Sequence, residues 1–313
     1  MKIIRVAGSG EVGPIAEDQA PQPQPGSGEL LVRVCAAGVT PSELLWYPTT
    51  HTKAGGIRSR AVPVHEFSGV IAAAGNEVTG FKAGQAIYGL NDWFADGALA
   101  EYCITQPSFV APKPQRLTHV EAASVPIGAL TAWQGLFERA QLQAGERVLV
   151  HGGSGSVGAF AVQLARHRGS HVIATASAGN IDFVKGLGAG QVIDYRTARF
   201  EEVARNMDVV FDTVGGDILQ RSWGVLGPHG RMVTVAANGE GATDDRTKQA
   251  FFIVEPNQGQ LKEIGDLLDS GRLQPVVDAV LPFSEARAAY SGAIKHGRGK
   301  LVIVVHAQES GAA

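Results

Sequence analysis

A chain of 313 residues is long enough for two domains, and 44% hydrophobic with 18% charged residues is typical of a globular protein with a sizeable core. The net charge of −3 offers no basic surface to nucleic acid or to an anionic membrane, and no apolar run approaches the ~20 residues that span a bilayer. Cys35 and Cys103 are too few for a disulfide framework or a four-thiolate metal site. We therefore expect a cytoplasmic protein without a signal peptide, whose partner is a small-molecule substrate.

Residues 1–122 predict a β-rich domain. Short alternating runs, such as residues 30–34, are separated by turns that are rich in proline and glycine. A polar stretch over 47–60 contains Gly55 and Gly56, and it fits either a mobile lid or a solvent-exposed loop.

Short apolar strands alternate with helical patterns from residue 123 onward. The expected strands are 147–151, 171–176, 191–194, 208–212 and 231–235, and the first helix is expected over 157–168. Buried parallel strands are continuous apolar runs joined by helices, so residues 123–256 predict a doubly wound α/β domain. One or two helices and a strand at 300–305 follow, and we expect residues 257–313 to return to the first domain.

A glycine-rich turn follows the strand at 147–151 and opens the first helix. The pattern G-x-G-x-x-G falls on Gly153, Gly155 and Gly158, where glycine permits a tight turn, close approach to a pyrophosphate and close helix packing. The free N–H groups of the following helix complete an anion site. The predicted phosphate-binding turn comprises Gly153, Ser154, Gly155, Ser156, Val157 and Gly158.

The end of the second strand indicates which dinucleotide binds. An NAD site places an acidic residue there to bind the ribose 2′-hydroxyl, but residues 175–180 contain none. A 2′-phosphate is therefore not repelled, and Ser177, Tyr195 and Arg196 can offer hydrogen bonds and a positive charge. These residues predict NADPH as the cofactor.

Seven further motifs occur in order along the chain. They are residues 36–41 (AAGVTP), 65–69 (HEFSG), 97–102 (GALAEY), 130–133 (LTAW), 187–195 (LGAGQVIDY), 211–216 (FDTVGG) and 299–302 (GKLV). With the glycine-rich turn, they resemble the medium-chain dehydrogenase/reductase superfamily, in its zinc-free, quinone-oxidoreductase-like branch. The resemblance covers nearly the whole chain.

The resemblance implies a GroES-like β-rich catalytic domain made from both chain ends, an inserted doubly wound Rossmann domain, a cofactor in the cleft between them and a homodimer. It implies that Thr131 lies beside the nicotinamide and that residues 251–254, including Phe252 and Val254, close over its ring. The chain also departs from the family. Asn180 replaces the usual lysine for the 2′-phosphate, and Gly179 replaces an arginine that close relatives often carry.

Zinc alcohol dehydrogenases of this superfamily use a histidine at the position of His65 as a metal ligand. The other matching positions hold Thr40, a poor zinc ligand, and Ile127, which is none, so we expect no metal. His65 is then either a hydrogen-bonded structural residue or a polar group that faces the substrate. Trp93 and Phe94 also have two possible roles: they fit either the wall of a substrate pocket or packing within the core or between domains.

Hydride transfer to an enone or a quinone puts negative charge on the carbonyl oxygen, which needs hydrogen-bond donors when zinc is absent. The candidates are Thr40, Tyr47 and His51, of which the last two lie in the 47–60 stretch. The sequence thus predicts an NADPH-dependent reductase of quinones or activated C=C bonds. The alternatives are a carbonyl or alcohol oxidoreductase and an NADP(H)-binding protein without turnover.

Asp212 is expected to cap a turn and His151 to end a strand.

Overall fold

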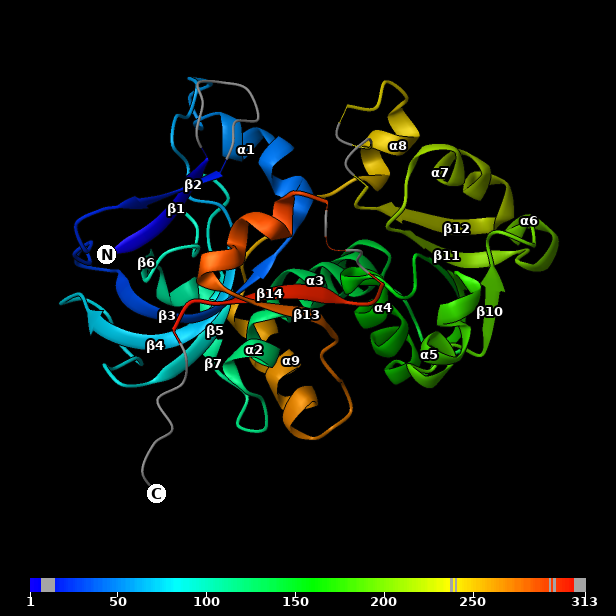
Figure 1. Ribbon diagram of the computed structural model, residues 1–313. Coiled ribbons are helices and arrows are strands. Elements are labelled where there is room, and N and C mark those ends of the chain that lie inside the picture. Colours follow the sequence, from blue (N-terminus) through cyan, green and yellow to red (C-terminus); the bar gives the residue numbers. More distant parts are fainter. Residues whose placement is uncertain (7–14, 237–238, 240, 293, 295–296, 307–313) are drawn as a thin grey trace.

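The computed structural model describes residues 1–6, 15–236, 239, 241–292, 294 and 297–306. Two sheets dominate it, and the longer one is built from both ends of the chain (Figure 1). Its strands are β3 (Leu30–Val39), β4 (Glu66–Ala74), β5 (Ala86–Leu90), β6 (Tyr102–Thr105), β7 (Val110–Pro112), β13 (Val277–Pro282) and β14 (Lys300–Val304). Strand β3 is central and buried along almost its whole length, which its run of small and branched apolar side chains allows.

The last strand returns to the sheet made by the first part of the chain. Strand β14 pairs antiparallel with β3, from Leu301 opposite Val39 to Val304 opposite Ala36, and β13 pairs parallel with β14. A separate two-stranded ribbon of β1 (Lys2–Val6) and β2 (Ile15–Gln19) lies against this domain through the bridge between Ile3 and Ala100.

The second sheet is entirely parallel and has the strand order β10-β9-β8-β11-β12. Its strands are β8 (Arg147–His151), β9 (His171–Ala176), β10 (Gln191–Asp194), β11 (Met207–Asp212) and β12 (Leu226–Thr234). The crossover helices are α4 (Ser156–His167), α5 (Ile181–Gly186), α6 (Phe200–Val203) and α7 (Gly216–Ser222). The strand order reverses between β8 and β11, and ligands of such sheets bind at the carboxyl ends of strands at this point.

Helices fill the space between the two sheets. The main ones are α2 (His119–Ala123), α3 (Pro126–Trp133) with its continuation η3 (Gln134–Arg139), and α9 (Gln258–Asp269). Helices α3 and α4 approach closely at Gly128, where a Cβ atom would lie 2.6 Å from the Ser156 carbonyl oxygen. One apolar core runs from Tyr88 and Leu90 of the first sheet to Val150 of the second, so the two domains pack on shared side chains.

The remaining elements are short. They are η1 (Pro41–Leu45), α1 (Tyr47–Thr50), η2 (Pro107–Phe109), η4 (Ala178–Asn180), η5 (Trp223–Val225), α8 (Asp245–Ala250) and η7 (Phe283–Tyr290). Within the described residues, no helix has the length and apolar character needed to cross a membrane. The architecture confirms the predicted GroES-like sheet domain with a doubly wound Rossmann domain.

Candidate active site

A cavity of about 390 Å³ lies between the two domains, at the point where the order of the parallel sheet reverses. The first domain contributes Thr40, Trp46 and Trp93, and the Rossmann domain contributes residues 155–157 of the glycine-rich turn. Helix α3 supplies Ile127 and Thr131, the loop after β11 supplies Thr213 and Val214, and residues 251–254 form the remaining wall. The cavity therefore brings together chain segments that are more than 200 residues apart.

The glycine-rich turn has the backbone geometry that a phosphate site requires. Gly152 has a φ of +74°, which favours glycine, and Gly158 packs so tightly that a Cβ atom would lie 2.1 Å from the Gly152 carbonyl oxygen. At Gly155, by contrast, a Cβ atom would meet nothing closer than 3.5 Å. Gly155 faces the cavity at the start of α4, so its lack of a side chain leaves space for a ligand rather than for the protein.

Residues 251–254 are held over the cavity by side chains from both domains. The Trp93 indole Nε1 donates to the Val254 carbonyl oxygen at 2.8 Å, and the Gln134 amide bonds the backbone of Glu255 as both donor and acceptor. Phe252 and Val254 are buried, as is Thr131. Trp93 thus lines the cavity and also packs between domains, while Gln134 was missed because a polar residue within a helix carries no distinguishing sequence signal.

Thr40 is held by a buried ion pair. The Lys300 ammonium donates to Thr40 Oγ1 at 2.9 Å and lies 2.5 Å from Glu66 Oε1. Glu66 Oε2 accepts from the Ile127 backbone N–H at 2.8 Å. Burial raises the pKa of the Glu66 carboxyl, and the charge of Lys300 opposes that rise. The pair is removed from solvent, with exposed side-chain fractions of 3% for Lys300 and 0% for Glu66.

His65 has the structural role that the sequence left as one of two options. Only 1% of the residue is exposed, its Nδ1 lies 3.6 Å from Glu43 Oε2, and its ring packs 5.2 Å from that of Trp93. Glu43 in turn accepts from the Val64 N–H and from the Tyr290 hydroxyl, at 3.0 and 2.7 Å. The histidine therefore supports the cavity wall from behind.

Tyr47 and His51 lie on the outer rim, outside the lining of the cavity. Their rings stack with centroids 4.4 Å apart and planes inclined by only 3°. Tyr47 is 46% exposed, and its hydroxyl lies beside Gly55. Of the three predicted proton donors, the structure brings only Thr40 into the cavity; a catalytic role for the other two stays a prediction.

The predicted 2′-phosphate residues lie after the ends of β9 and β10. Ser177 directly follows β9, and its hydroxyl accepts from the Asn180 side-chain amide at 3.3 Å. The same amide lies 3.2 Å from Ser154 Oγ in the glycine-rich turn. Tyr195 is 53% exposed, and the Arg196 guanidinium lies 5.6 Å from the centre of its ring. The Asn180 amide therefore links Ser177, at the end of β9, to the glycine-rich turn.

The last residues of β11 and β8 have the roles that their sequence context indicated. Asp212 caps the next turn by accepting from the Val214 and Gly215 N–H groups, and His151 ends β8 with its ring between Thr175 and Ser222. Burial lowers the pKa of His151 to about 4, so it is neutral at physiological pH. Thr213 and Val214 were missed as cavity residues, although their position after a parallel strand was a usable signal.

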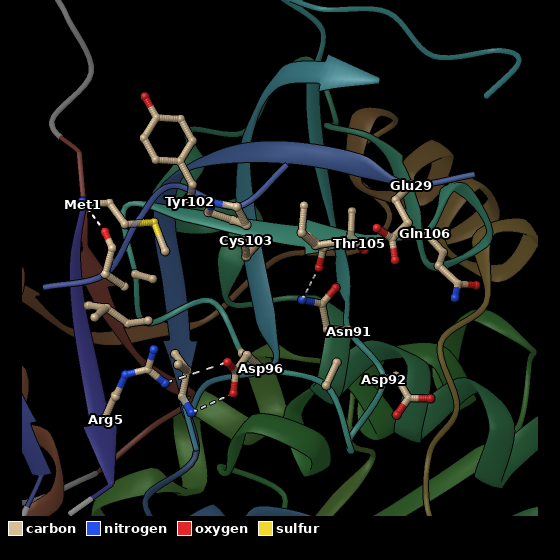
Figure 2. Close-up of a pocket in the computed structure, with 18 of the residues that line it drawn as sticks. Met1, Arg5, Glu29, Asn91, Asp92, Asp96, Tyr102, Cys103, Thr105 and Gln106 are labelled. Carbon is tan, nitrogen blue, oxygen red and sulfur yellow. Dashed lines mark hydrogen bonds and ion pairs between the residues drawn. The ribbon is translucent and has the colours of Figure 1, made fainter. Parts of the chain in front are cut away.

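A second cavity, of about 380 Å³, lies in the first domain and is shown in Figure 2. Asn91, Cys103 and Thr105 lie on one side of it, and Met1 and Arg5 on the other. All of its lining residues precede residue 110, and it has no wall from the parallel sheet. The dinucleotide-binding turn therefore identifies the cavity between the domains as the candidate active site.

Known protein families match both domains. Residues 26–115 match the alcohol dehydrogenase GroES-like domain, and residues 187–303 match a domain described as zinc-binding dehydrogenase. The chain belongs to the medium-chain dehydrogenase/reductase superfamily. It falls in the quinone-oxidoreductase-like branch, as the motifs predicted, and is an oxidoreductase that uses a nicotinamide cofactor.

Individual relatives cover almost the same length. A probable zinc-binding mitochondrial oxidoreductase of Arthroderma benhamiae is 33% identical over 91% of both chains. The chloroplastic NADPH-dependent alkenal/one oxidoreductase of Arabidopsis thaliana is 31% identical over 88% of this chain and 72% of its own. The quinone oxidoreductase of Coxiella burnetii has a similar structure, with a TM-score of 0.84, 29% identity and coverage of 98% and 99%. In the described residues, no three His, Cys, Asp or Glu side chains group as a metal site, even though two of these descriptions mention zinc.

Proposed function

We propose that the protein uses NADPH to reduce quinones or the activated C=C bond of enones, and that it does so without a metal. The observation that carries the proposal is the Thr40 hydroxyl, which is fixed by Lys300 inside an apolar cavity beside the dinucleotide turn. The Arabidopsis relative, named for alkenals and enones, supports the substrate class.

The residues present fit a nicotinamide dinucleotide. Gly155 leaves space at the amino end of α4 for the pyrophosphate, and Thr131 with residues 251–254 would hold the nicotinamide ring. When bound, the reduced nicotinamide supplies the hydride. The buried positions of Thr131, Phe252 and Val254 keep water from this part of the cavity.

Thr40 is the hydrogen-bond donor for the negative charge that develops on the substrate oxygen. An ammonium group can only donate, so the Thr40 oxygen accepts from Lys300 and keeps its own proton for another acceptor. No hydrogen bond from the Thr40 hydroxyl to another described residue is observed, so its proton is free to be donated to the substrate oxygen. The charge of Lys300 polarises the hydroxyl and strengthens the donated bond. Bulk solvent then supplies the final proton to the product.

The shape of the cavity favours a flat, unsaturated substrate. The rings of Trp46 and Trp93 meet edge to face with centroids 5.3 Å apart, and both line the cavity. Phe252 and Val254 add apolar surface to the lining, and aromatic walls bind planar conjugated molecules well. Neither wall distinguishes a quinone from an enone.

The side chains at the positions of the zinc ligands support metal-free catalysis. Ile127 occupies one of the positions where zinc-dependent relatives bind the metal, and it has no coordinating atom. His65 is turned toward Glu43 and Trp93. Elemental analysis of the purified protein tests this point, because stoichiometric zinc that is lost together with activity on chelation would contradict it.

A substrate panel separates this proposal from its alternatives. NADPH oxidation is followed with enones, quinones, aldehydes and ketones at matched concentrations. Turnover confined to aldehydes or ketones would support a carbonyl oxidoreductase, since Thr40 would stabilise that oxyanion equally well. Tight NADPH binding without turnover of any of them would support a non-catalytic binding protein. The proposal expects the highest kcat/KM with an enone or a quinone.

We also propose a homodimer, because β12 is one of the two edge strands of the parallel sheet in the described residues and can pair with a second copy. Light scattering during gel filtration tests it.

The cytoplasm is the proposed compartment, since Cys35 and Cys103 are buried free thiols of the kind that a reducing environment preserves. Two relatives are instead named as mitochondrial and chloroplastic proteins. Cell fractionation tests the cytoplasmic assignment.

A further inference from the structure

The return segment of the first domain crosses to the Rossmann domain immediately before β14. Gly299 forms a parallel bridge with Gly155, and its N–H donates to the Ser154 carbonyl oxygen at 2.9 Å. Figure 1 shows β14 reaching from the longer sheet toward the start of α4. Residues of this segment therefore lie directly beside the dinucleotide-binding turn, although they come from the opposite end of the chain.

Arg298 extends from this segment over the end of β9. Its Nε donates to Asn180 Oδ1 at 2.8 Å, its Nη2 donates to the Gly179 carbonyl oxygen at 2.9 Å, and its guanidinium lies 4.8 Å from the centre of the Phe183 ring. These contacts fix the guanidinium against the two positions, 179 and 180, that lack a basic residue in this sequence. Asn180 also reaches Ser154 and Ser177 through its side-chain amide.

The residues that follow the second strand of a Rossmann domain face the 2′ position of the adenosine ribose. Here that place contains Ser177 and no carboxylate, and the Arg298 guanidinium reaches it from the return segment of the other domain. A guanidinium has five N–H groups, of which the bonds to Asn180 and Gly179 use two. The remaining three are available to an anion, and the planar fork suits phosphate oxygens.

We propose that Arg298 binds the 2′-phosphate of NADPH and so replaces the basic residue that the Rossmann domain lacks. This inference rests on the proposed preference for NADPH. Asp278 supports the arrangement by accepting from the Gly297 and Arg298 backbone N–H groups, at 2.9 and 3.2 Å, which sets the course of the segment. The 2′-phosphate is then held by both domains, with Ser177 and Tyr195 on the Rossmann side.

The same short segment carries Lys300, which holds Thr40 in the active site. A single residue, Gly299, thus separates the cation at the adenosine end of the cleft from the cation beside the reacting carbonyl. A ligand that engages Arg298 holds this segment in place, whereas a ligand without the 2′-phosphate does not. We therefore expect 2′-phosphorylated ligands to stabilise the whole protein more than their unphosphorylated counterparts.

Binding of 2′,5′-ADP and of 5′-AMP to the full chain, measured by titration calorimetry, tests the assignment without any turnover. We compare the wild type with Arg298→Met, which removes the charge, and Arg298→Lys, which keeps it without the fork. Arg287→Met, on the exposed face of η7 in the same return segment, is the matched control. Thermal melting with each ligand gives a second readout and shows that every variant is folded.

The expected results are specific. The wild type binds 2′,5′-ADP more tightly than 5′-AMP. Arg298→Met lowers the affinity for 2′,5′-ADP about 10- to 100-fold, as for the loss of a charge-assisted contact, and lowers the affinity for 5′-AMP less than about 3-fold. Arg298→Lys falls between, and Arg287→Met matches the wild type. If the wild type prefers 2′,5′-ADP and Arg298→Met binds it with unchanged affinity, the role of Arg298 is overturned but the NADPH preference stands. Equal binding of both ligands by the wild type overturns the NADPH preference as well as this inference.

Discussion

The ammonium nitrogen of Lys300 lies 2.9 Å from the hydroxyl oxygen of Thr40, and 260 positions separate the two residues in the sequence. The bond joins the last strand of the chain to the wall of the active site. It also orients the threonine, because an ammonium cannot accept and the hydroxyl proton must point elsewhere. Lys300 is thus a positioning residue for the hydroxyl that we propose as the hydrogen-bond donor of the reaction.

Removing the charge of Lys300 should slow the reaction without abolishing cofactor binding. Lys300→Met alone leaves Glu66 buried and unpaired, which costs about 3–5 kcal/mol of stability, so the variant to assay is Lys300→Met with Glu66→Gln. We expect kcat to fall about 10-fold or more, while Kd for NADPH changes less than about 3-fold. Glu66→Gln alone keeps the hydrogen bond from Lys300 to Thr40 and serves as the control once thermal melting shows it to be folded, because it leaves the Lys300 charge buried and unpaired. An unchanged kcat in the folded double variant would show that Lys300 has only a structural role.

Thr40→Val should lower kcat by about 10- to 1000-fold, the range observed for the loss of one oxyanion donor. Thr40→Ser keeps the hydroxyl and should retain most of the activity. Tyr47→Phe tests the catalytic role that stays a prediction for that residue, and we expect a smaller loss of kcat than for Thr40→Val, because the Tyr47 side chain lies outside the described lining of the cavity. Steady-state rates of the three variants on the best enone decide which residue supplies the hydrogen bond. A large loss in Tyr47→Phe with a small loss in Thr40→Val would exchange the two roles.

Gly155→Val should abolish NADPH binding and leave the protein folded. Gly155 has φ −74° and ψ 173°, which any residue adopts, and its Cβ would enter only the space reserved for the pyrophosphate. Gly158→Ala is the informative comparison, because its Cβ would collide with the Gly152 carbonyl oxygen and should lower Tm instead. Fluorescence titration and thermal melting separate the two effects. NADPH binding of wild-type strength in Gly155→Val would mean that the turn is not the phosphate site.

Acid should destabilise the protein through two buried histidines. Burial lowers the pKa of His119 and of His151 to about 4 in each case, below the ~6.5 of an unfolded histidine. The unfolded chain then binds more protons, so the stability present above pH ~6.5 is lost as the pH falls toward 4. Chemical unfolding from pH 7 to 4.5 should show this slope, and His151→Asn should reduce it. An unaltered slope in that variant would assign the acid sensitivity to other groups.

Sequence patterns predicted the Rossmann strands well where burial on both faces makes them uniformly apolar. Strands β8, β9 and β10 have the predicted limits, and α4 begins and ends one residue earlier than expected. Strand β12 is longer than the predicted 231–235, since its first half, with Gly227, Pro228 and Gly230, has no apolar pattern. The helix at 47–50 was missed because four residues are too few to show a helical period.

The site was predicted only in the parts that short motifs define. The glycine-rich turn is a local pattern, and Thr40, Thr131 and the 251–254 loop were placed through family motifs. No local pattern marks Lys300 as the partner of Thr40 or Arg298 as the neighbour of Asn180, because both relationships arise from the return of β14 across the domain boundary. Tyr47 and His51 were placed by position in a loop whose course the sequence does not determine.

The most direct test of metal-free catalysis by Thr40 is single-turnover NADPH oxidation with the best enone, before and after exhaustive chelation. We expect the same rate for the wild type in both states, and a rate about 10-fold or more slower for Thr40→Val at saturating NADPH. A wild-type rate that collapses on chelation and returns with zinc would contradict it, as would equal rates for the wild type and Thr40→Val.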